Sequence, residues 1–410
     1  MKEPSISRRR FLTASSGLAA SLLAPLARPA GSAGLKASAT DGGADLQVSQ
    51  GAQPPVPGAR FVRTLTLGHA ARSSDPPLNR RLGAGLDARL FTDLSGLSPG
   101  AMVTPNEYFF IRTECPADIG ATRPSTLAIG GNVRRPRTLG FDTIEPLITG
   151  MGTHLLECAG NSNPNNYGLM SVAQWDGIPI RALLDRLQPS SSGFRVLVSG
   201  VDDERHPSRT STSGASWIFS RDDLDHAHAF LATHMNGVPL PRHHGAPIRL
   251  VVPGWYGCAC IKWVNRIDLV EDGVAATSQM REFAARTHQP QDVTLAREFT
   301  PAVIDLAAMP IRVEQWAAGG HPVYRIIGIV WGGSKPAHTL QIRVRSGAPW
   351  VDVGDYHPPE STAVWSLWSH IWQPPEPGRY EIVLRTTDPA IRTRRLDLFF
   401  YVRLVDISET

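Results

Sequence analysis

The stretch HLLECAGNSNPNNYG, residues 154–168, places a single cysteine between an apolar run and a polar loop. The residues before Cys158 are typical of a buried strand, whereas the Gly, Asn, Ser and Pro residues after it predict a loop. A cysteine that only packs in a core needs no such loop, because it behaves as a small hydrophobic residue. A thiolate that binds a metal or attacks a substrate needs hydrogen-bond donors and space beside it. The stretch therefore predicts a functional thiol where a strand ends.

The bulk composition is that of an ordinary globular protein. The chain has 410 residues, of which 42% are hydrophobic and 19% charged, and this length favours two domains. Its net charge of +4 is located in the first 33 residues, which contain Lys2, Arg8, Arg9, Arg10 and Arg28 against Glu3. The remainder is close to neutral, which argues against a nucleic-acid partner.

The N-terminus has the layout of an export signal. An arginine cluster in SRRRFL, residues 7–12, precedes an apolar run and then small residues. This order matches a twin-arginine signal, which exports folded proteins, although a plain secretory signal or an uncleaved anchor would have a similar layout. We therefore predict a signal over residues 1–33, a periplasmic or other extracytoplasmic location, and a cofactor inserted before export.

The four cysteines form no Cys-x-x-Cys pair, zinc knuckle or haem-attachment motif. Cys258 and Cys260 lie two residues apart, so on a strand they would face the same side, and we expect them to pack in the core. A structural disulfide framework is not expected.

The middle of the chain predicts a mixed domain. Residues 34–95 are interpreted as a lead-in segment, small and polar at its start. Over residues 96–288, strand-like runs (STLAIGGNV, FRVLVSGVD and PIRLVVPG) alternate with short helices, including one predicted over residues 178–187. This order favours an α+β fold, that is, a mixed α/β domain.

The C-terminal region, residues 289–410, has a different pattern. Short β-rich runs such as HPVYRIIGIVWGG and GRYEIVLRTTD are separated by Gly, Pro and Asp, which is typical of a β-sandwich. Its tryptophans are expected in the core or at an interface, since aromatic residues dominate both. A homodimer contact through this region is one prediction.

Three separated segments carry a resemblance to a known family. They are TPNEYFFIRTE (104–114), which contains Arg112, ECAGN (157–161), and HMNGVPLPRHHGAPIRLVVPGWYGCACIKWV (234–264). In order and spacing they resemble the sulfite oxidase family of molybdenum enzymes, from about residue 101 to the C-terminus. The resemblance implies a sulfite-oxidase-type molybdopterin-binding domain followed by an immunoglobulin-like β-sandwich that serves as a dimerisation domain.

The resemblance also implies a cofactor, molybdenum–molybdopterin, with Cys158 as the thiolate ligand of the metal. Soft sulfur ligands suit a redox metal, and binding requires the deprotonated thiol. Gly160 and Asn161 would bring backbone and amide donors near the ligands of the metal.

The pterin and its phosphate have their own implied binding residues. The family resemblance assigns His244, Arg249 and Lys262 to the pterin and phosphate, and Asp202 to the pterin ring. Arginine bonds a phosphate bidentately and lysine supplies a point charge, so these residue types suit the task. Individually, each could equally form a salt bridge at a strand end.

The substrate pocket departs from the family pattern. Arg112 is retained, but the arginines expected directly after CAGN are Ser162 and Asn163, the active-site tyrosine is replaced near Phe283, and an expected histidine is Glu114. A late family arginine has no secure match, with Arg392, Arg394 and Arg395 as candidates. A dianion buried without matching cations is penalised by several kcal/mol. We therefore expect sulfite to be a poor substrate, and a neutral or bulkier sulfur compound to be a better one.

The sequence thus predicts an exported molybdenum oxidoreductase that performs oxygen-atom transfer on a sulfur-containing or similar small substrate. Because the chain has no haem motif, two electrons would be exchanged with an external carrier such as a cytochrome or a quinone system. Three alternatives remain: a sulfoxide reductase, a cofactor-free enzyme in which Cys158 is a nucleophile paired with His244, and an exported binding protein.

Overall fold

The computed structural model describes residues 53–68, 76–115, 126–161, 168–190, 193–201, 214–398 and 401–408, and residues Val48–Thr410 form one compact unit. Three predictions lie outside the described residues: the signal over residues 1–33, the pterin-binding Asp202, and the replaced arginine positions Ser162 and Asn163.

The first sheet has five strands in the order β3-β2-β11-β6-β7. β2 and β11 pair in parallel, and the other neighbours pair antiparallel. β6 shows why the sequence forms a strand here, because Val196 and Val198 are buried while the residues between and beside them are only partly covered. The strands are β2 (Thr126–Gly131), β3 (Arg137–Gly140), β6 (Phe194–Gly200), β7 (Ser216–Phe219) and β11 (Val264–Glu271).

The second sheet positions the cysteine that the sequence singled out. It has the order β10-β8-β5-β4, with the short β9 paired to β8. β4 ends at Glu157, directly before Cys158, and β10 begins at Arg249, so two of the predicted site residues are placed by this sheet. Its strands are β4 (Thr149–Glu157), β5 (Met170–Pro179), β8 (Phe230–Met235), β9 (Val238–Pro239) and β10 (Arg249–Val251).

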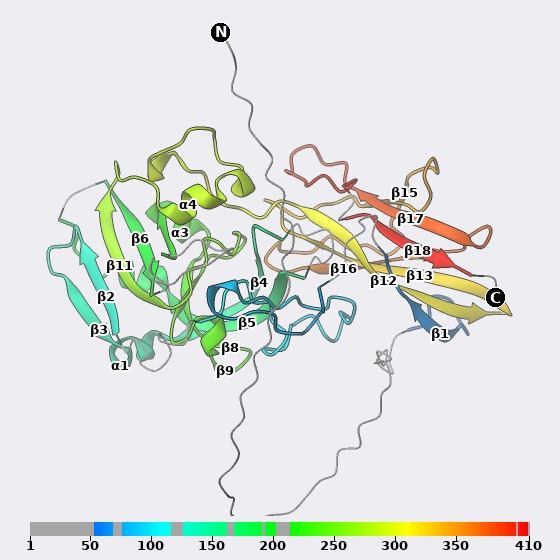
Figure 1. Cartoon of the computed structure of the whole chain (residues 1–410), viewed down its shortest axis with the longest axis horizontal. Helices are drawn as coiled ribbons and strands as arrows, with labels where there is room; N and C mark the ends of the chain where they lie inside the picture. The colour runs from blue at the N-terminus through cyan, green and yellow to red at the C-terminus, as the bar shows by residue number, and fades with distance from the viewer. Residues whose placement is uncertain are drawn as a thin grey trace, which may run out of the picture. The chain divides into compact units, whose positions relative to one another are not determined.

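Two four-stranded sheets, β1-β12-β13-β16 and β15-β14-β17-β18, contain most of the C-terminal region (Figure 1). Four tryptophans are buried here, at positions 316, 331, 365 and 368, as the composition suggested for a core. The immunoglobulin-like topology, the boundary at residue 288 and the dimer stay predictions. The strands are β1 (Arg60–Leu65), β12 (Ala307–Ala318), β13 (His321–Trp331), β14 (Gln341–Arg343), β15 (Val351–Asp352), β16 (Ser366–Trp372), β17 (Gly378–Arg385) and β18 (Arg403–Ile407).

Helices are fewer and shorter than an α+β fold requires, so the prediction of a balanced mixture is corrected to a mostly sheet fold. The helix predicted over residues 178–187 is reduced to α2 (Ile180–Leu184), because Ile178 and Pro179 remain in β5 and pair with β8. The other helices are α1 (Phe141–Ile144), α3 (Arg221–His226), α4 (Ser278–Phe283), η1 (Gly85–Asp87), η3 (Glu145–Leu147), η4 (Arg242–His244), η5 (Ala285–Thr287) and η6 (Ala296–Glu298).

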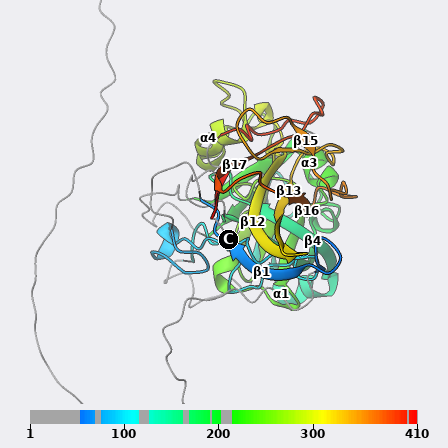
Figure 2. The same cartoon turned by 90° about the vertical axis from the view of Figure 1, so that its right-hand side faces the viewer.

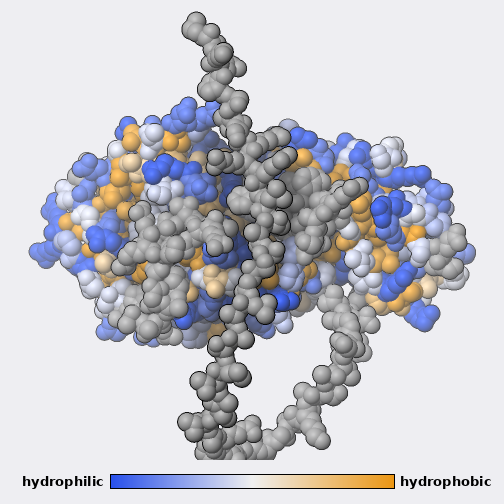
Figure 3. Space-filling view, viewed as in Figure 1, coloured by the Kyte–Doolittle hydropathy of each residue, from blue (hydrophilic) through white to orange (hydrophobic). Residues whose placement is uncertain are grey.

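The described part of the predicted lead-in is built into the fold. β1 pairs antiparallel with β12 and runs beside it in both views (Figures 1 and 2), and Gly68 pairs with Leu404. One continuous hydrophobic core includes residues of all four sheets. On the face seen in Figure 3, hydrophobic residues occur in small groups among hydrophilic ones. Among the described residues, no helix has the length and apolar character needed to cross a membrane.

Candidate active site

Cys158 lies at the end of β4, where the chain leaves the sheet. Its backbone N–H donates to the Leu169 carbonyl (3.0 Å), and the Gly160 N–H donates to its Sγ (3.3 Å). On the other side, the Gly257 N–H donates to the Glu157 carbonyl (2.6 Å), and a Cβ at Gly257 would lie only 3.1 Å from that oxygen. The chain around Cys158 is therefore held from both sides, by its own loop and by residue 257.

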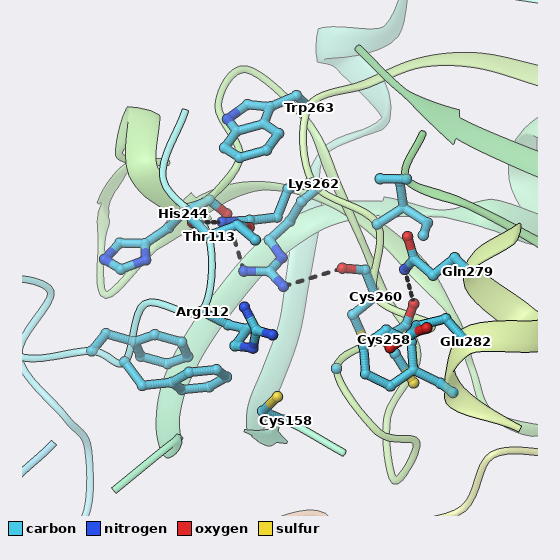
Figure 4. Close-up of a pocket in the computed structure, with 17 residues that line it drawn as sticks. Arg112, Thr113, Cys158, His244, Cys258, Cys260, Lys262, Trp263, Gln279 and Glu282 are labelled. Atoms are coloured by element: carbon cyan, nitrogen blue, oxygen red, sulfur yellow. Dashed lines mark hydrogen bonds between the residues drawn. The ribbon is translucent and has the colours of Figure 1, made fainter. Parts of the chain in front are cut away.

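The Cys158 side chain lines a cavity of about 890 Å³, part of which is open to solvent (Figure 4). Figure 4 shows Arg112 extending toward Cys158, with Lys262 and Trp263 farther from the thiol. The lining also includes Phe109, Phe110, Thr113, Ala215, His244, Arg249, Gly257, Cys258, Cys260, Ile261, Gln279, Glu282 and Phe283.

One wall of the cavity carries two cations held by backbone carbonyls. Arg249, a buried residue, donates to the carbonyls of His244 (3.0 Å) and Cys260 (3.4 Å), and its guanidinium lies over the Trp175 ring. Lys262 donates to the carbonyls of Thr113 and His243. Gly245, with φ +116°, lies between the two cations, and a Cβ there would come within 2.9 Å of the Arg249 Cβ. Only glycine allows this close approach.

Arg249 is buried without a counter-charge. Its Nε has no hydrogen-bond partner, and no carboxylate among the described residues pairs with it. Burial lowers the pKa of Arg249 to about 10, so the guanidinium is still charged at neutral pH. A buried cation with an unused hydrogen-bond donor destabilises the folded protein unless an anionic group pairs with it. This wall therefore fits the phosphate end of a cofactor.

His244 is neutral at physiological pH. Burial lowers its pKa from 6.5 to about 3, opposed by a hydrogen bond to the Asn106 carbonyl, and Lys262 and Arg249 lower it further. Its Nε2 lies 3.0 Å from the Asn106 oxygen, and its ring packs edge-on against Phe109. No hydrogen bond joins His244 to Cys158 among the described contacts, which does not favour the alternative of a Cys–His nucleophile pair.

Positive charge around Cys158 exceeds the sequence prediction. Burial raises the pKa of its thiol, while Arg112, the Gly160 N–H and Arg286 lower it. A Cβ at Gly160 would lie 3.6 Å from Nη1 of Arg286, which is on η5, so this arginine is close to the Cys158 loop. Its guanidinium lies over the Phe283 ring. Arg89 is also within electrostatic range of the thiol and donates to the Arg112 carbonyl. Arg112 lines the cavity, whereas Arg286 and Arg89 influence the thiol without lining it, so the cation-poor substrate pocket stays a prediction.

The other predicted replacements are placed as follows. Phe283 lines the cavity, close to where the family tyrosine was expected. Glu114 pairs with His243 (2.9 Å) and Arg81 (3.0 Å), and it does not line the cavity. The lining includes one carboxylate, that of the exposed Glu282.

The late arginines do not reach the cavity. Arg392 pairs with Asp305, Arg394 with Glu157, and Arg395 with Asp397. The idea that one of the three replaces a substrate-binding arginine is therefore not supported by their side-chain positions. Arg286 lies near the Cys158 loop, unlike these three arginines, and its position could not be recognised from the ECAGN motif.

Asn161 holds the loop instead of facing the cavity. Its side-chain Nδ2 donates to Glu157 Oε1 (3.0 Å), and its side-chain Oδ1 accepts from the Leu169 N–H (3.0 Å). The predicted contact of Asn161 with the cofactor is corrected accordingly, because both ends of its side chain are already bonded and it does not line the cavity. The expected donor to the sulfur is instead the Gly160 N–H.

Cys258 and Cys260 are buried, as expected, but not on a strand. They lie between β10 and β11 and line the cavity, because the chain turns there around the cofactor wall. Burial raises the pKa of both thiols, and the neighbouring Cys158 raises that of Cys258 further. All four cysteines are free, in agreement with the absence of a predicted disulfide framework.

The sequence of this chain is similar to sequences of known proteins. A family model described as "Oxidoreductase molybdopterin binding domain" matches residues 116–277, the part that contains Cys158, Arg249 and Lys262. Sulfite oxidase of Gallus gallus is 28% identical over 315 residues, which cover 70% of this chain and 66% of the relative. Sulfite oxidase of Mus musculus is 26% identical and covers 70% of this chain and 56% of the relative.

These matches identify an oxidoreductase molybdopterin-binding domain in this chain and show its similarity to the sulfite oxidases. Molybdenum–molybdopterin is the cofactor that they indicate, and the buried Arg249, the partly buried Lys262 and the thiol fit it. The chain spans about two thirds or less of the length of the sulfite oxidases that it matches.

Two further relatives show the range of the family. The catalytic subunit of a protein-methionine-sulfoxide reductase from Xanthomonas axonopodis pv. citri is 29% identical over 188 residues, 44% of this chain and 53% of that subunit. The sulfane dehydrogenase SoxCD from Paracoccus pantotrophus superposes with a TM-score of 0.57 at 19% identity, over 84% of this chain and 91% of that chain. At that identity the likeness shows the fold alone.

Proposed function

We propose that the chain is a molybdenum-dependent oxidoreductase that transfers an oxygen atom to or from the sulfur of a small anionic substrate. The observation that carries this proposal is the cavity, which is lined by Cys158, by Arg112 and by the cation-bearing cofactor wall, with Arg286 in electrostatic range of the thiol. The matching molybdopterin-binding domain supports the oxidoreductase chemistry, and the names of the relatives favour sulfur compounds.

The chain's residues divide the work between holding the cofactor and orienting the substrate. Arg249 and Lys262 would bind the phosphate of the pterin, and Cys158 would bind the metal as a thiolate. The bound cofactor supplies two-electron redox chemistry with oxygen-atom transfer. Arg112 and Arg286 would orient an anionic substrate near Cys158, since charges placed beside reacting atoms stabilise developing charge strongly in an enclosed site.

The charge of the site bears on the choice of substrate. With three arginines, Arg112, Arg286 and Arg89, in electrostatic range of the thiol, an anionic sulfur compound is favoured over a neutral sulfoxide, in contrast to the expectation from sequence alone. Reduction of a sulfoxide is the second candidate, favoured by the similarity to the methionine-sulfoxide reductase subunit. Exposed Glu282 on the cavity lining lowers the net positive charge and leaves room for this alternative.

The cellular setting is part of the same proposal. The twin-arginine pattern supports export of the folded, cofactor-loaded protein to the periplasm. An external carrier, a cytochrome or a quinone system, would exchange the two electrons, because the chain has no haem-attachment motif. Residues 289–410 would form an immunoglobulin-like domain through which a homodimer assembles.

The decisive experiment is analysis of the purified, exported protein for metal and pterin. We expect molybdenum near one atom per chain and a releasable pterin. Turnover is then measured with sulfite and other sulfur oxyanions in the presence of artificial electron acceptors, and with sulfoxides in the presence of donors. A metal-free protein with hydrolytic or thiol-transfer activity would support the cofactor-free alternative, and a metal-free inert protein the binding-protein alternative.

A further inference from the structure

The carboxylate next to Cys158 is buried and fully bonded. Glu157 has no solvent exposure, and its two oxygens accept four hydrogen bonds. Arg394 Nη1 and Nη2 donate to Oε1 and Oε2 at 2.8 Å each, Asn161 Nδ2 donates to Oε1 (3.0 Å), and Trp331 Nε1 donates to Oε2 (2.9 Å). A carboxylate offers about four acceptor positions, so Glu157 has none left for another group.

Arg394 comes from the C-terminal region, 237 residues after Glu157. Besides the carboxylate, it donates to the hydroxyls of Tyr256 (2.9 Å) and Tyr401 (3.2 Å), and its guanidinium lies over the rings of Tyr256 and Trp331. Its side chain is only 12% exposed. The ion pair is thus bidentate, desolvated and surrounded by aromatic groups, which is the geometry in which an arginine–carboxylate pair is strongest.

We propose that Arg394 is a positioning residue for Cys158, acting through Glu157. Two of the partners of Glu157 belong to the C-terminal region, whereas the third, Asn161, belongs to the Cys158 loop and also fixes Leu169. The backbone N–H of Cys158 in turn donates to the Leu169 carbonyl. Arg394 therefore holds the strand end and the loop in one network, and the position of the thiol depends on residues of the C-terminal region.

The pair also sets the electrostatic surroundings of the thiol. Glu157 places a fixed negative charge one residue from Cys158, and Arg394 balances it. Loss of one partner leaves the other buried and uncompensated, which destabilises a protein strongly, whereas loss of both is tolerated far better. This inference rests on the proposed function, since it takes Cys158 as the ligand of the metal.

The test compares four variants of the cofactor-loaded protein: Glu157→Gln, Arg394→Met, the double variant, and Arg395→Met as a control. Arg395 neighbours Arg394 but pairs with Asp397 at an exposed position. The measured quantity is the reduction potential of the metal, followed by its electron paramagnetic resonance signal. Removing the buried anion should shift the potential to more positive values, because reduction adds negative charge. Removing the cation should shift it to more negative values.

The double variant should return close to the wild-type potential, and Arg395→Met should not change it. If Arg394→Met does not fold, the double variant compared with Glu157→Gln still isolates the charge of Arg394, and its potential should be the more negative of the two. Unchanged potentials, or shifts of the same sign in both single variants, would overturn the inference while leaving the proposed function intact. A wild-type protein without molybdenum would overturn both.

Discussion

The two ends of the cavity are built differently, although both carry positive charge. At the cofactor end, Arg249 is buried and held by backbone carbonyls, and Gly245 lets the chain pass closely between it and Lys262. Beside the Cys158 end, Arg286 lies outside the cavity lining, is exposed, and forms no hydrogen bond or ion pair with any residue in the described ranges. A buried, preorganised cation suits a resident group that stays bound, whereas an exposed one suits a substrate that exchanges.

Replacement of Cys158 by serine should have the largest effect. An alcohol is a poor ligand for a soft redox metal, so we expect loss of molybdenum and a fall in turnover of more than about a hundredfold. This fall exceeds the loss caused by removing a residue that only supports a metal ligand. Metal content, turnover and far-UV circular dichroism are measured together. Full turnover in Cys158→Ser would remove the thiol from the site.

Arg249→Met tests the cofactor end. The variant keeps the volume of the side chain but removes the buried charge, so pterin retention should fall about ten- to a hundredfold, the value of a charge-assisted hydrogen bond. Released pterin is quantified after a dilution series. Arg345→Met, at an exposed position, is the matched control and should retain the wild-type pterin content. Equal retention in both variants would contradict the phosphate assignment.

Arg286→Ala tests the exposed end. We expect KM for an anionic substrate to rise by about two- to fivefold, the size of an exposed charge interaction, and the effect to shrink at high salt. KM for a neutral sulfoxide should stay unchanged. Arg281→Ala, on the adjacent α4, removes an arginine that donates to the Ala276 carbonyl and serves as the control. If neutral and anionic substrates are affected equally, Arg286 does not select for charge.

The contribution of His244 is tested through the pH dependence of stability rather than through turnover. Its pKa is about 3 in the folded protein and 6.5 as an ordinary value, so below pH 6.5 the unfolded chain binds a proton that the folded one does not. The free energy of unfolding therefore falls as pH decreases from 6.5. His244→Gln should reduce this slope by up to about 1.4 kcal/mol per pH unit between pH 6 and 5.

Denaturant titrations at several pH values provide the comparison for His244. His321→Gln, at an exposed position in β13, is the control and should keep the wild-type slope. An unchanged slope in His244→Gln would mean that burial of this imidazole does not govern its protonation.

Much of the fold could be predicted from local sequence pattern. The alternating run that begins at Phe194 contains β6 (Phe194–Gly200), and the β-rich runs after residue 307 form strands of the two C-terminal sheets, because side-chain periodicity and turn residues are local properties. The helix over 178–187 was overestimated, since pairing of β5 with β8 is a long-range contact that overrides the helical spacing of its apolar residues.

The same limit applies to the functional site, where residues within motifs could be predicted and contacts between distant segments could not. The motifs placed Cys158, Arg112, His244, Arg249 and Lys262, and the structure brings these five residues to one cavity. Arg286 and Arg89 were missed because they come from segments without a motif, and the ion pair between Glu157 and Arg394 joins residues 237 positions apart in the sequence. Only the acidic residue beside the cysteine and the late arginine cluster could have indicated that pair.

The pairing of β1 with β12 has a consequence for biosynthesis. Arg60–Leu65 leaves the ribosome early, but its partner Ala307–Ala318 is made about 250 residues later, so this edge of the sheet stays incomplete until most of the chain has been translated. Contacts of such long sequence separation slow folding and expose unpaired strands. A chain that ends before residue 307 would thus lack the strand that pairs with its own β1.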